Sequence, residues 1–297
     1  MKILRARHLG MCFGVRDAIR LAQRESRQTS LTVLGDLVHN EAVLDDLRRR
    51  GIRLERDLAR VETEAVLVTA HGTSDRRRAE ILQRGHRLLE ATCPLVKFAH
   101  QRIADLVRDG CFPVIIGQRD HVEVRGLTGD LDAFAVILDE GEIPGIPERP
   151  VYGVASQTTQ PPERVERLVE ALRRHFPRSE VRFADTVCRP TRDRQSAARE
   201  VAAASDVVIV VGGSRSNNTR ELVATCQQLC DRVYHVQTAA DLSEAWFQPD
   251  DTVGLTAGTS TPDDVVDAVE HRIRDLADSA SEAGKLVDVP GRELVSA

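Results

Sequence analysis

Two kinds of segment alternate along the chain. Short runs of β-branched and other apolar residues, each ending at a glycine, occupy positions 31–35, 113–117 and 207–212. Each run follows a longer, mixed polar and apolar segment with helical patterning, at about 14–27, 94–109 and 191–204. Strands that alternate with helices of this length favour parallel sheets with right-handed crossovers, so the pattern predicts an α/β fold.

A second apolar segment in each copy ends in small and hydroxyl-bearing residues. The three segments are VLVTAHGTS (66–74), VYGVASQTTQP (151–161) and VGLTAGTSTPD (253–263), and their alignment pairs His71, Gln157 and Gly258. A fixed order of elements in three copies is typical of an internal repeat. We therefore expect three pseudo-threefold-related α/β domains with mainly parallel sheets around a common centre.

The repeat also gives the expected domain boundaries. The first domain spans residues 13–95, the second spans 96–186, and the third combines 1–12 with 187–278. Residues 279–297 are polar and weakly patterned, so they are expected to form a C-terminal tail.

The composition narrows the class of protein. Aromatic residues make up only 3% of the chain, so the core must consist of Val, Leu, Ile and Ala, which suits buried parallel sheets. The formal net charge is −5, and the runs of arginine lie in polar helical segments, so no nucleic-acid partner is expected. The sequence has no apolar run of bilayer-spanning length and no signal-peptide core at its start, which indicates a cytoplasmic protein without a membrane partner.

Six cysteines in a reducing compartment indicate metal binding or catalysis rather than disulfides. Cys12, Cys93 and Cys188 precede the glycines that end the first strands by 23, 24 and 24 residues. Each stands at a helix start, where the helix dipole stabilises a thiolate that can bind metal. Soft thiolates select zinc or iron–sulfur clusters, and three of them would leave one iron of a cubane cluster open to substrate.

The alternative is that the three are buried free cysteines, a common state for this residue. Their equivalent positions in the repeat argue against it. Cys111, Cys226 and Cys230 have no counterparts in the other copies, so we expect these three to pack in the core.

Polar residues follow the strands at the same edge. His39, His71 and His121 each follow a strand, and two loops carry hydroxyl and amide groups: Ser214, Ser216, Asn217, Asn218 and Thr219 in the first, Thr259, Ser260 and Thr261 in the second. Such loops before helices suit a phosphate group. Ordinary capping of the helix that starts near Thr219 is the simpler alternative, and both can hold.

Glu123, two residues after His121, stands beside an apolar strand. A carboxyl group held near a cluster could donate a proton to a leaving hydroxyl, as a general acid does. A single Glu on a loop is more often solvated, so the residue alone does not decide between the two.

Nine motifs in order resemble the LytB family, the 4-hydroxy-3-methylbut-2-enyl diphosphate reductases of the non-mevalonate isoprenoid pathway. They are GMCFGVRDAI (10–19), LGDLVHN (34–40), TAHGTS (69–74), EATCPLV (90–96), HVEVRG (121–126), SQTT (156–159), DTVC (185–188), SNNTR (216–220) and TAGTSTPD (256–263). They cover the chain from about residue 2 to 275.

The resemblance implies a fold, a cofactor and an activity. It implies three α/β domains around a central [4Fe-4S] cluster held by Cys12, Cys93 and Cys188. The open iron would take the substrate hydroxyl, and reductive dehydroxylation would give isopentenyl and dimethylallyl diphosphate, with ferredoxin or flavodoxin as the electron donor. Glu123 would deliver the proton, and Thr158 would relay it or orient the hydroxyl. The diphosphate would bind to His39, His71, His121, Ser216, Asn217, Asn218 and Ser260.

Four positions depart from the family pattern. Asn217 takes the place of a second serine, Arg125 stands where an acidic residue is common, Pro190 replaces a small residue, and Glu90 replaces Asp. These changes leave open a divergent iron–sulfur reductase of another small phosphorylated alcohol. A non-enzymatic iron–sulfur sensor or carrier, or a zinc hydrolase that uses the same thiols, are further alternatives.

Overall fold

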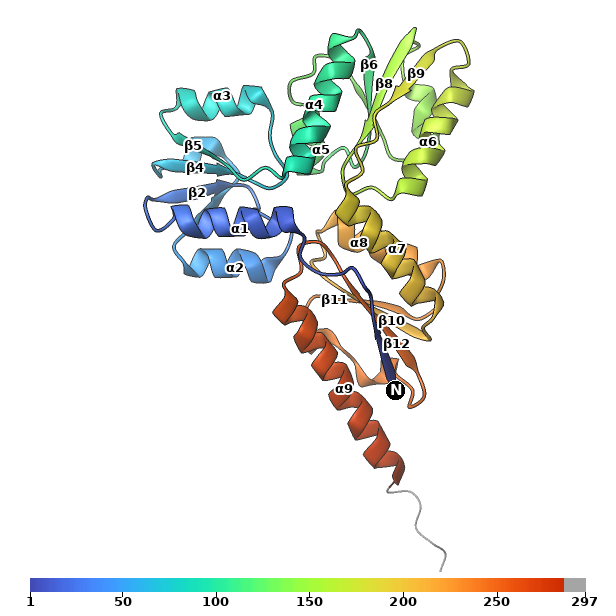
Figure 1. The fold of residues 1–297 in the computed structure, drawn as a ribbon. Helices are drawn as coiled ribbons and strands as arrows, with labels where there is room; N and C mark the ends of the chain where they lie inside the picture. Colours follow the sequence, from blue (N-terminus) through green and yellow to red (C-terminus); the bar gives the residue numbers. More distant parts are fainter. Residues whose placement is uncertain (286–297) are drawn as a thin grey trace, which may run out of the picture.

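The computed structural model describes residues 1–285 and consists of three lobes around a common centre (Figure 1). Each lobe contains one sheet of four parallel strands. The first sheet contains β2 (Leu31–Leu34), β3 (Arg53–Glu55), β4 (Ala65–Val68) and β5 (Arg87–Glu90). The second contains β6 (Phe112–Ile116), β7 (Ala135–Ile137), β8 (Val151–Ser156) and β9 (Glu180–Phe183). The third contains β1 (Lys2–Arg5), β10 (Val207–Val211), β11 (Val233–Val236) and β12 (Thr252–Ala257).

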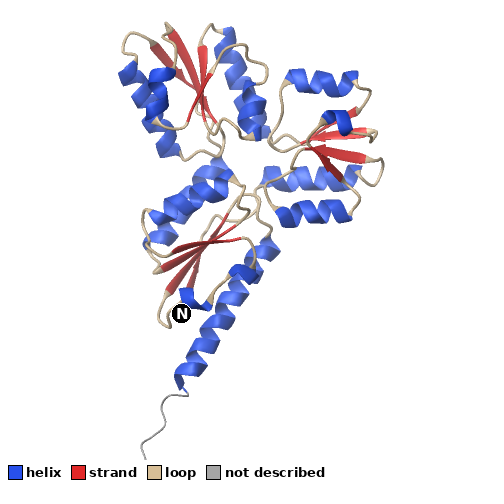
Figure 2. Cartoon of the chain, turned by 180° about the vertical axis from the view of Figure 1, so that it is seen from behind, coloured by secondary structure: helices blue, strands red, loops and turns tan. Residues whose placement is uncertain are grey.

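The strands of each lobe lie between helices (Figure 2). The α-helices are α1 (Phe13–Glu25), α2 (Glu41–Arg49), α3 (Asp75–Gln83), α4 (Pro94–Arg108), α5 (Val122–Thr128), α6 (Pro162–His175), α7 (Arg189–Ala203), α8 (Asn217–Gln227) and α9 (Asp263–Lys285). Short 3-10 helices occur at η1 (Leu58–Arg60), η2 (Glu140–Gly145), η3 (Ala239–Asp241) and η4 (Glu244–Trp246).

The three sheets share one topology. Their strand orders are β3-β2-β4-β5, β7-β6-β8-β9 and β11-β10-β12-β1, so each strand of one lobe has a counterpart in the other two. The N-terminal strand β1 completes the third sheet by pairing with β12. The last strand of each sheet therefore leads into the first helix of the next lobe, and this connection carries one of the three repeat cysteines.

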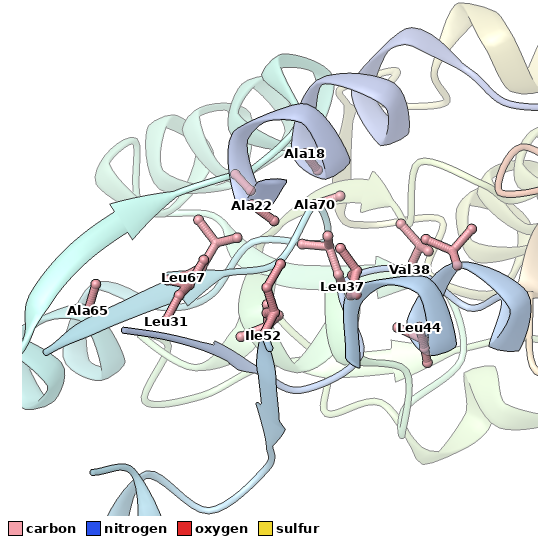
Figure 3. Close-up of a cluster of buried hydrophobic side chains, with 14 residues drawn as sticks. Ala18, Ala22, Leu31, Leu37, Val38, Leu44, Ile52, Ala65, Leu67 and Ala70 are labelled. Atoms are coloured by element: carbon pink, nitrogen blue, oxygen red, sulfur yellow. The ribbon is translucent and has the colours of Figure 1, made fainter. Parts of the chain in front are cut away.

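Aliphatic side chains hold each lobe together. In the first lobe, Ala18 and Ala22 of α1 and Leu44 of α2 pack against Leu31 and Leu67 on one face of the sheet (Figure 3). The other two lobes have equivalent clusters, between β6–β9 and α6 and between β10–β12 and α9. Burial of each Leu or Val side chain contributes about 1.5–3 kcal/mol. These sheets are covered on both faces, as parallel sheets generally are.

The predicted fold class, three parallel-sheet α/β domains, is confirmed. The helices and first strands of the repeat lie within two residues of their expected positions. The outer strands of every sheet were not predicted, because they are short and half-exposed. α9 continues to Lys285, past residue 278, where the tail was expected to begin. Residues 286–297 of that tail lie outside the described residues, and the domain boundaries stay a prediction.

The alignment of the second strands is wrong by two residues in the first copy. Val68, Ser156 and Ala257 end β4, β8 and β12 opposite the last residues of β2, β6 and β10. The next residues, Thr69, Gln157 and Gly258, are therefore equivalent, and His71 is the counterpart of Thr159 and Ser260. The three segments were aligned by their small and hydroxyl-bearing residues, and these do not occupy equivalent positions after the three strands.

Within the described part of the chain, the helices are all too short or too polar to cross a bilayer.

Candidate active site

Three helices begin at the centre of the molecule and run outward (Figure 1). Cys12, Cys93 and Cys188 occupy the N-cap positions of α1, α4 and α7. Each cysteine N–H donates to a backbone carbonyl in the loop after a second strand: Cys12 to Thr259, Cys93 to Ala70 and Cys188 to Thr158, all at 3.0 Å. One interaction, repeated three times, fixes the three thiols at equivalent places.

The thiols lie close to one another. A Cβ atom at Gly14, in the first turn of α1, would be 2.5 Å from the Cys93 sulfur, so only glycine allows this approach. The field of Cys12 acts on both Cys93 and Cys188. All three cysteines are free and half-buried, which fits a soft metal group with thiolate ligands.

Burial changes the expected protonation of these thiols. Burial raises the pKa of the Cys188 thiol to about 11 and also raises the pKa of Cys93, although backbone N–H groups of the first helical turn act in the opposite direction. The helix start therefore acts on these two thiols in the expected direction, but burial outweighs it. A bound metal would have to displace the proton.

The remaining cysteines pack in the core, as expected. Cys226 and Cys230 belong to the apolar cluster of α7, α8 and β10, and Cys111 is buried beside Gly153.

The three histidines of the strand-end loops form a cluster. Their ring centroids lie 4.5 Å apart for His39 and His71, 5.2 Å for His39 and His121, and 5.6 Å for His71 and His121. Burial lowers the pKa of all three, and for His121 to about 3. The histidines also repel each other's positive charge, so the cluster is neutral at pH 7 without a ligand.

Several buried polar atoms of the site have no hydrogen-bond partner within residues 1–285. They are both ring nitrogens of His39, Oδ1 of Asn217, Nδ2 of Asn218 and Oγ1 of Thr219. Unpaired buried polar groups are rare, because each forfeits its hydration. Their grouping indicates a place for a polar ligand.

The hydroxyl and amide loops hold this group in position. Ser216 caps α8 by accepting from the N–H of Thr219, which confirms the capping alternative. Asn218 Oδ1 accepts from the N–H of Thr259 at 3.0 Å, and Ser260 Oγ lies 3.4 Å from the His39 carbonyl. Capping uses the Ser216 oxygen only as an acceptor, so its hydroxyl proton stays free for a ligand.

Asn217 is buried and tied to the second lobe. Its side-chain N–H group donates to Thr159 Oγ1 at 3.0 Å, while its oxygen is unpaired. Thr159 is the counterpart of His71 in the repeat. It was not predicted as a site residue, because the two-residue error in the alignment concealed this equivalence.

Glu123 is buried in the first turn of α5, with 1% of its surface exposed. Its carboxylate accepts from the Thr158 N–H at 2.6 Å, and the Thr158 carbonyl accepts from Cys188. Burial raises the pKa of Glu123 to about 7, against the opposing effect of Thr158. The solvated alternative is therefore wrong, and the carboxyl group can exchange a proton near neutral pH.

A cleft of about 1030 Å³ reaches the histidine cluster from outside. His39 and His121 line it, together with arginines from all three lobes: Arg56, Arg77, Arg119, Arg125, Arg215 and Arg220. The fields of Arg220 and Arg125 further lower the pKa of His121. The acidic residues Asp36, Asp120 and Glu142 also line the cleft, so six arginines against three carboxylates leave its lining with a net positive charge.

Three parallel-sheet α/β lobes around three free thiols define a class of metal-binding α/β protein. The family model described as LytB protein matches residues 3–274, and the chain belongs to the LytB family. This confirms the resemblance seen in the motifs.

Two curated relatives carry the same name. The 4-hydroxy-3-methylbut-2-enyl diphosphate reductase of Pelobacter propionicus is 35% identical over 93% of this chain and 99% of its own length. The reductase of the same name from Aquifex aeolicus is 32% identical over 93% of this chain and 97% of its own length.

Solved structures agree in fold. One, described as (E)-4-hydroxy-3-methyl-but-2-enyl diphosphate reductase, the terminal enzyme of the non-mevalonate pathway, matches with a TM-score of 0.67 and 31% identity, covering 92% of this chain and 99% of the other. The E-1-hydroxy-2-methyl-but-2-enyl-4-diphosphate reductase from Plasmodium falciparum matches with a TM-score of 0.84 over 97% of this chain and 88% of the other; at 23% identity it supports the fold alone.

Proposed function

We propose that this protein is an oxidoreductase that removes the hydroxyl group of 4-hydroxy-3-methylbut-2-enyl diphosphate to give isopentenyl and dimethylallyl diphosphate. The reaction consumes two electrons and two protons and releases water. The observation that carries the proposal is the meeting of three thiols, one carboxyl group with a pKa of about 7 and a neutral histidine cluster at one centre. The names of the relatives support the choice of substrate.

Cys12, Cys93 and Cys188 would hold a [4Fe-4S] cluster. Their free thiols, their equivalent N-cap positions and the glycine contact at Gly14 fit such a group. A cluster with three protein ligands supplies electrons one at a time and an open iron for the hydroxyl group. The electrons would come from ferredoxin or flavodoxin in the cytoplasm.

The diphosphate would bind between the histidine cluster and the start of α8. His39, His71 and His121 each offer a ring N–H as neutral imidazoles. Ser216, Asn217, Asn218 and Ser260 add side chains from the third lobe. Arg220 and Arg125, whose charges act on His121, and the N-terminus of α8 favour an anion here.

Glu123 would hold and deliver the proton. Its hydrogen bond with the Thr158 N–H fixes the carboxyl group, and its raised pKa lets it hold a proton near neutral pH. Thr158 would orient the substrate hydroxyl or relay the proton, because its backbone already joins Glu123 to Cys188. Because the carboxyl group is buried, bulk water would be excluded from the proton transfer.

Anaerobic purification tests the proposal, with iron and sulfide analysis followed by a reductant-driven assay on the substrate. Iron and sulfide near four each per chain, together with turnover, would support it. A cluster without turnover would favour a divergent reductase of another phosphorylated alcohol, or a sensor or carrier. Zinc in place of iron would contradict it.

A second candidate rests on the histidines themselves. The ligand atoms of His39, His71 and His121 all lie within 4.8 Å of one another, which is compatible with a three-histidine metal site. The surrounding arginines oppose a divalent cation, so we favour the anion. Metal retained after Cys12, Cys93 and Cys188 are all replaced by Ser, and lost after His121→Ala, would reverse that preference.

A further inference from the structure

Arg194, on the second turn of α7, is a buried cation without a carboxylate partner. Of the arginines and lysines whose side chains are described, it alone is buried, with 8% of its surface exposed. It forms no ion pair with a carboxylate in the described part of the chain, whereas most arginines of this protein do. An unpaired buried charge strongly destabilises a fold unless another group compensates it.

The guanidinium group joins the first turn of α7 to the loop that carries Cys12. Its Nε and Nη2 donate to the carbonyl of Gly10 at 3.1 and 2.6 Å, and its Nη1 donates to the carbonyl of Pro190 at 3.1 Å. Gly10 lies two residues before Cys12, and Pro190 lies two residues after Cys188. The guanidinium group of Arg194 therefore holds the backbone next to Cys12 and Cys188.

The groups placed to compensate Arg194 are those thiols, once they are ionised. Burial lowers the pKa of Arg194, whereas Cys12 and Cys188 act most strongly in the opposite direction, ahead of the neighbouring Asp193. Carbonyl oxygens satisfy its hydrogen bonds but bring no charge. Thiolates of a metal-loaded centre would supply that charge beside the guanidinium group.

We propose that Arg194 is a positioning residue that supplies the positive charge for the three-thiolate centre and raises the reduction potential of the group bound there. This inference rests on the proposed function, because it requires the iron–sulfur cluster. A fixed cation favours the reduced, more negative state of a cluster, and charge and hydrogen bonding near the sulfurs set cluster potentials. Thr191, whose hydroxyl lies 3.1 Å from the Cys188 sulfur, acts on the same ligand from one turn earlier.

The test compares Arg194→Met and Arg194→Lys with Arg199→Met in the loaded enzyme. Arg199 is on the same helix and pairs with Glu163 on α6, so its variant loses the same charge away from the centre. A redox titration followed by EPR should show a lower midpoint potential for Arg194→Met, by a tenfold change in the reduction equilibrium or about 59 mV for one electron. Arg194→Lys and Arg199→Met should stay near the wild type. Equal potentials in Arg194→Met and Arg199→Met would overturn the proposal.

A second measurement covers the case in which Arg194→Met binds no cluster. In the metal-free protein the cation is uncompensated, so Arg194→Met should raise the thermal unfolding midpoint, and Arg199→Met should not. An unchanged or lower midpoint, or equal loss of cluster in Arg194→Lys and Arg194→Met, would mean that the side chain only clamps the backbone, and the proposal would fail. If the purified wild-type protein contains no iron or sulfide, the proposed function is refuted. The unfolding midpoints of metal-free Arg194→Met and Arg199→Met would still show whether the charge of Arg194 is uncompensated.

Discussion

Replacing Glu123 by Gln removes the proton that the mechanism needs and leaves the geometry in place. The Gln side chain keeps an oxygen that can accept from the Thr158 N–H, so the 2.6 Å contact has a substitute. Loss of a general acid lowers rates by about 10²–10⁴-fold. We expect kcat to fall by that factor with little change in KM, because Glu123 lies outside the histidine cluster.

The pH dependence gives a sharper test. The pKa of Glu123 is about 7 in the folded protein and has an ordinary value of 4.5, so the folded state binds its proton more tightly. The resulting stability is fully present below pH 4.5 and is lost as the pH rises through 7. At about 1.4 kcal/mol per pH unit, the loss amounts to roughly 3 kcal/mol.

Two assays follow from this magnitude. Wild-type kcat should decline above pH 7 with a single ionisation, and Glu123→Gln should lack that decline. In thermal unfolding, Glu123→Gln should gain stability relative to the wild type as the pH rises from 5 to 8, whereas Glu148→Gln, on an exposed loop, should not. Undiminished turnover in Glu123→Gln would refute the assignment of the acid. A stability difference that does not change with pH would refute the raised pKa.

Three further substitutions test other parts of the site. Gly14→Ala should abolish iron binding, although Ala favours helices, because the new Cβ would meet the Cys93 sulfur. Gly145→Ala is the control, because a Cβ atom there would have no other atom within 4 Å. Normal iron content in both variants would contradict the contact between Gly14 and Cys93. His121→Asn should make the stability of the ligand-free protein less sensitive to acid. The pKa of His121 is about 3 in the folded protein, so wild-type stability falls by about 1.4 kcal/mol per pH unit below pH 6.5. Thermal unfolding midpoints of variant and wild type that change in parallel from pH 7 to 5 would exclude this. Asn217→Ser should lower KM several-fold, by about 1 kcal/mol of binding, because a hydroxyl donor replaces an unpaired acceptor; an unchanged KM would place Asn217 away from the diphosphate.

The features that could be predicted from the sequence are the elements that recur in the repeat and the strands that are strongly apolar. The inner strands are continuous apolar runs such as Val207–Val211, and the constant spacing of the three cysteines marked the centre. The outer strands carry no such signal: β3 is only Arg-Leu-Glu, and its pairing depends on the neighbouring β2. Tertiary context determines such strands.

The site was predictable only in part, for similar reasons. Glu123 and the histidines were found through the strand-end loops, but their burial and altered pKa values come from three lobes packed together. Arg194 lies in the polar stretch TRDRQ, which reads as a solvated helix face, so no local pattern distinguished it from Arg192, which pairs with Asp185 at the surface.

The pairing of β1 with β12 has a consequence for synthesis. The strand β1 is made before the first two lobes, but its partner β12, Thr252–Ala257, is made after them. The first two lobes can fold while they are being made, since domains generally fold in order from the N-terminus. Until then β1 is an unpaired strand, exposed to wrong partners. Cys12 is thus the first of the three ligands to be synthesised and the last to be placed, so the centre can be completed only after translation of the third lobe.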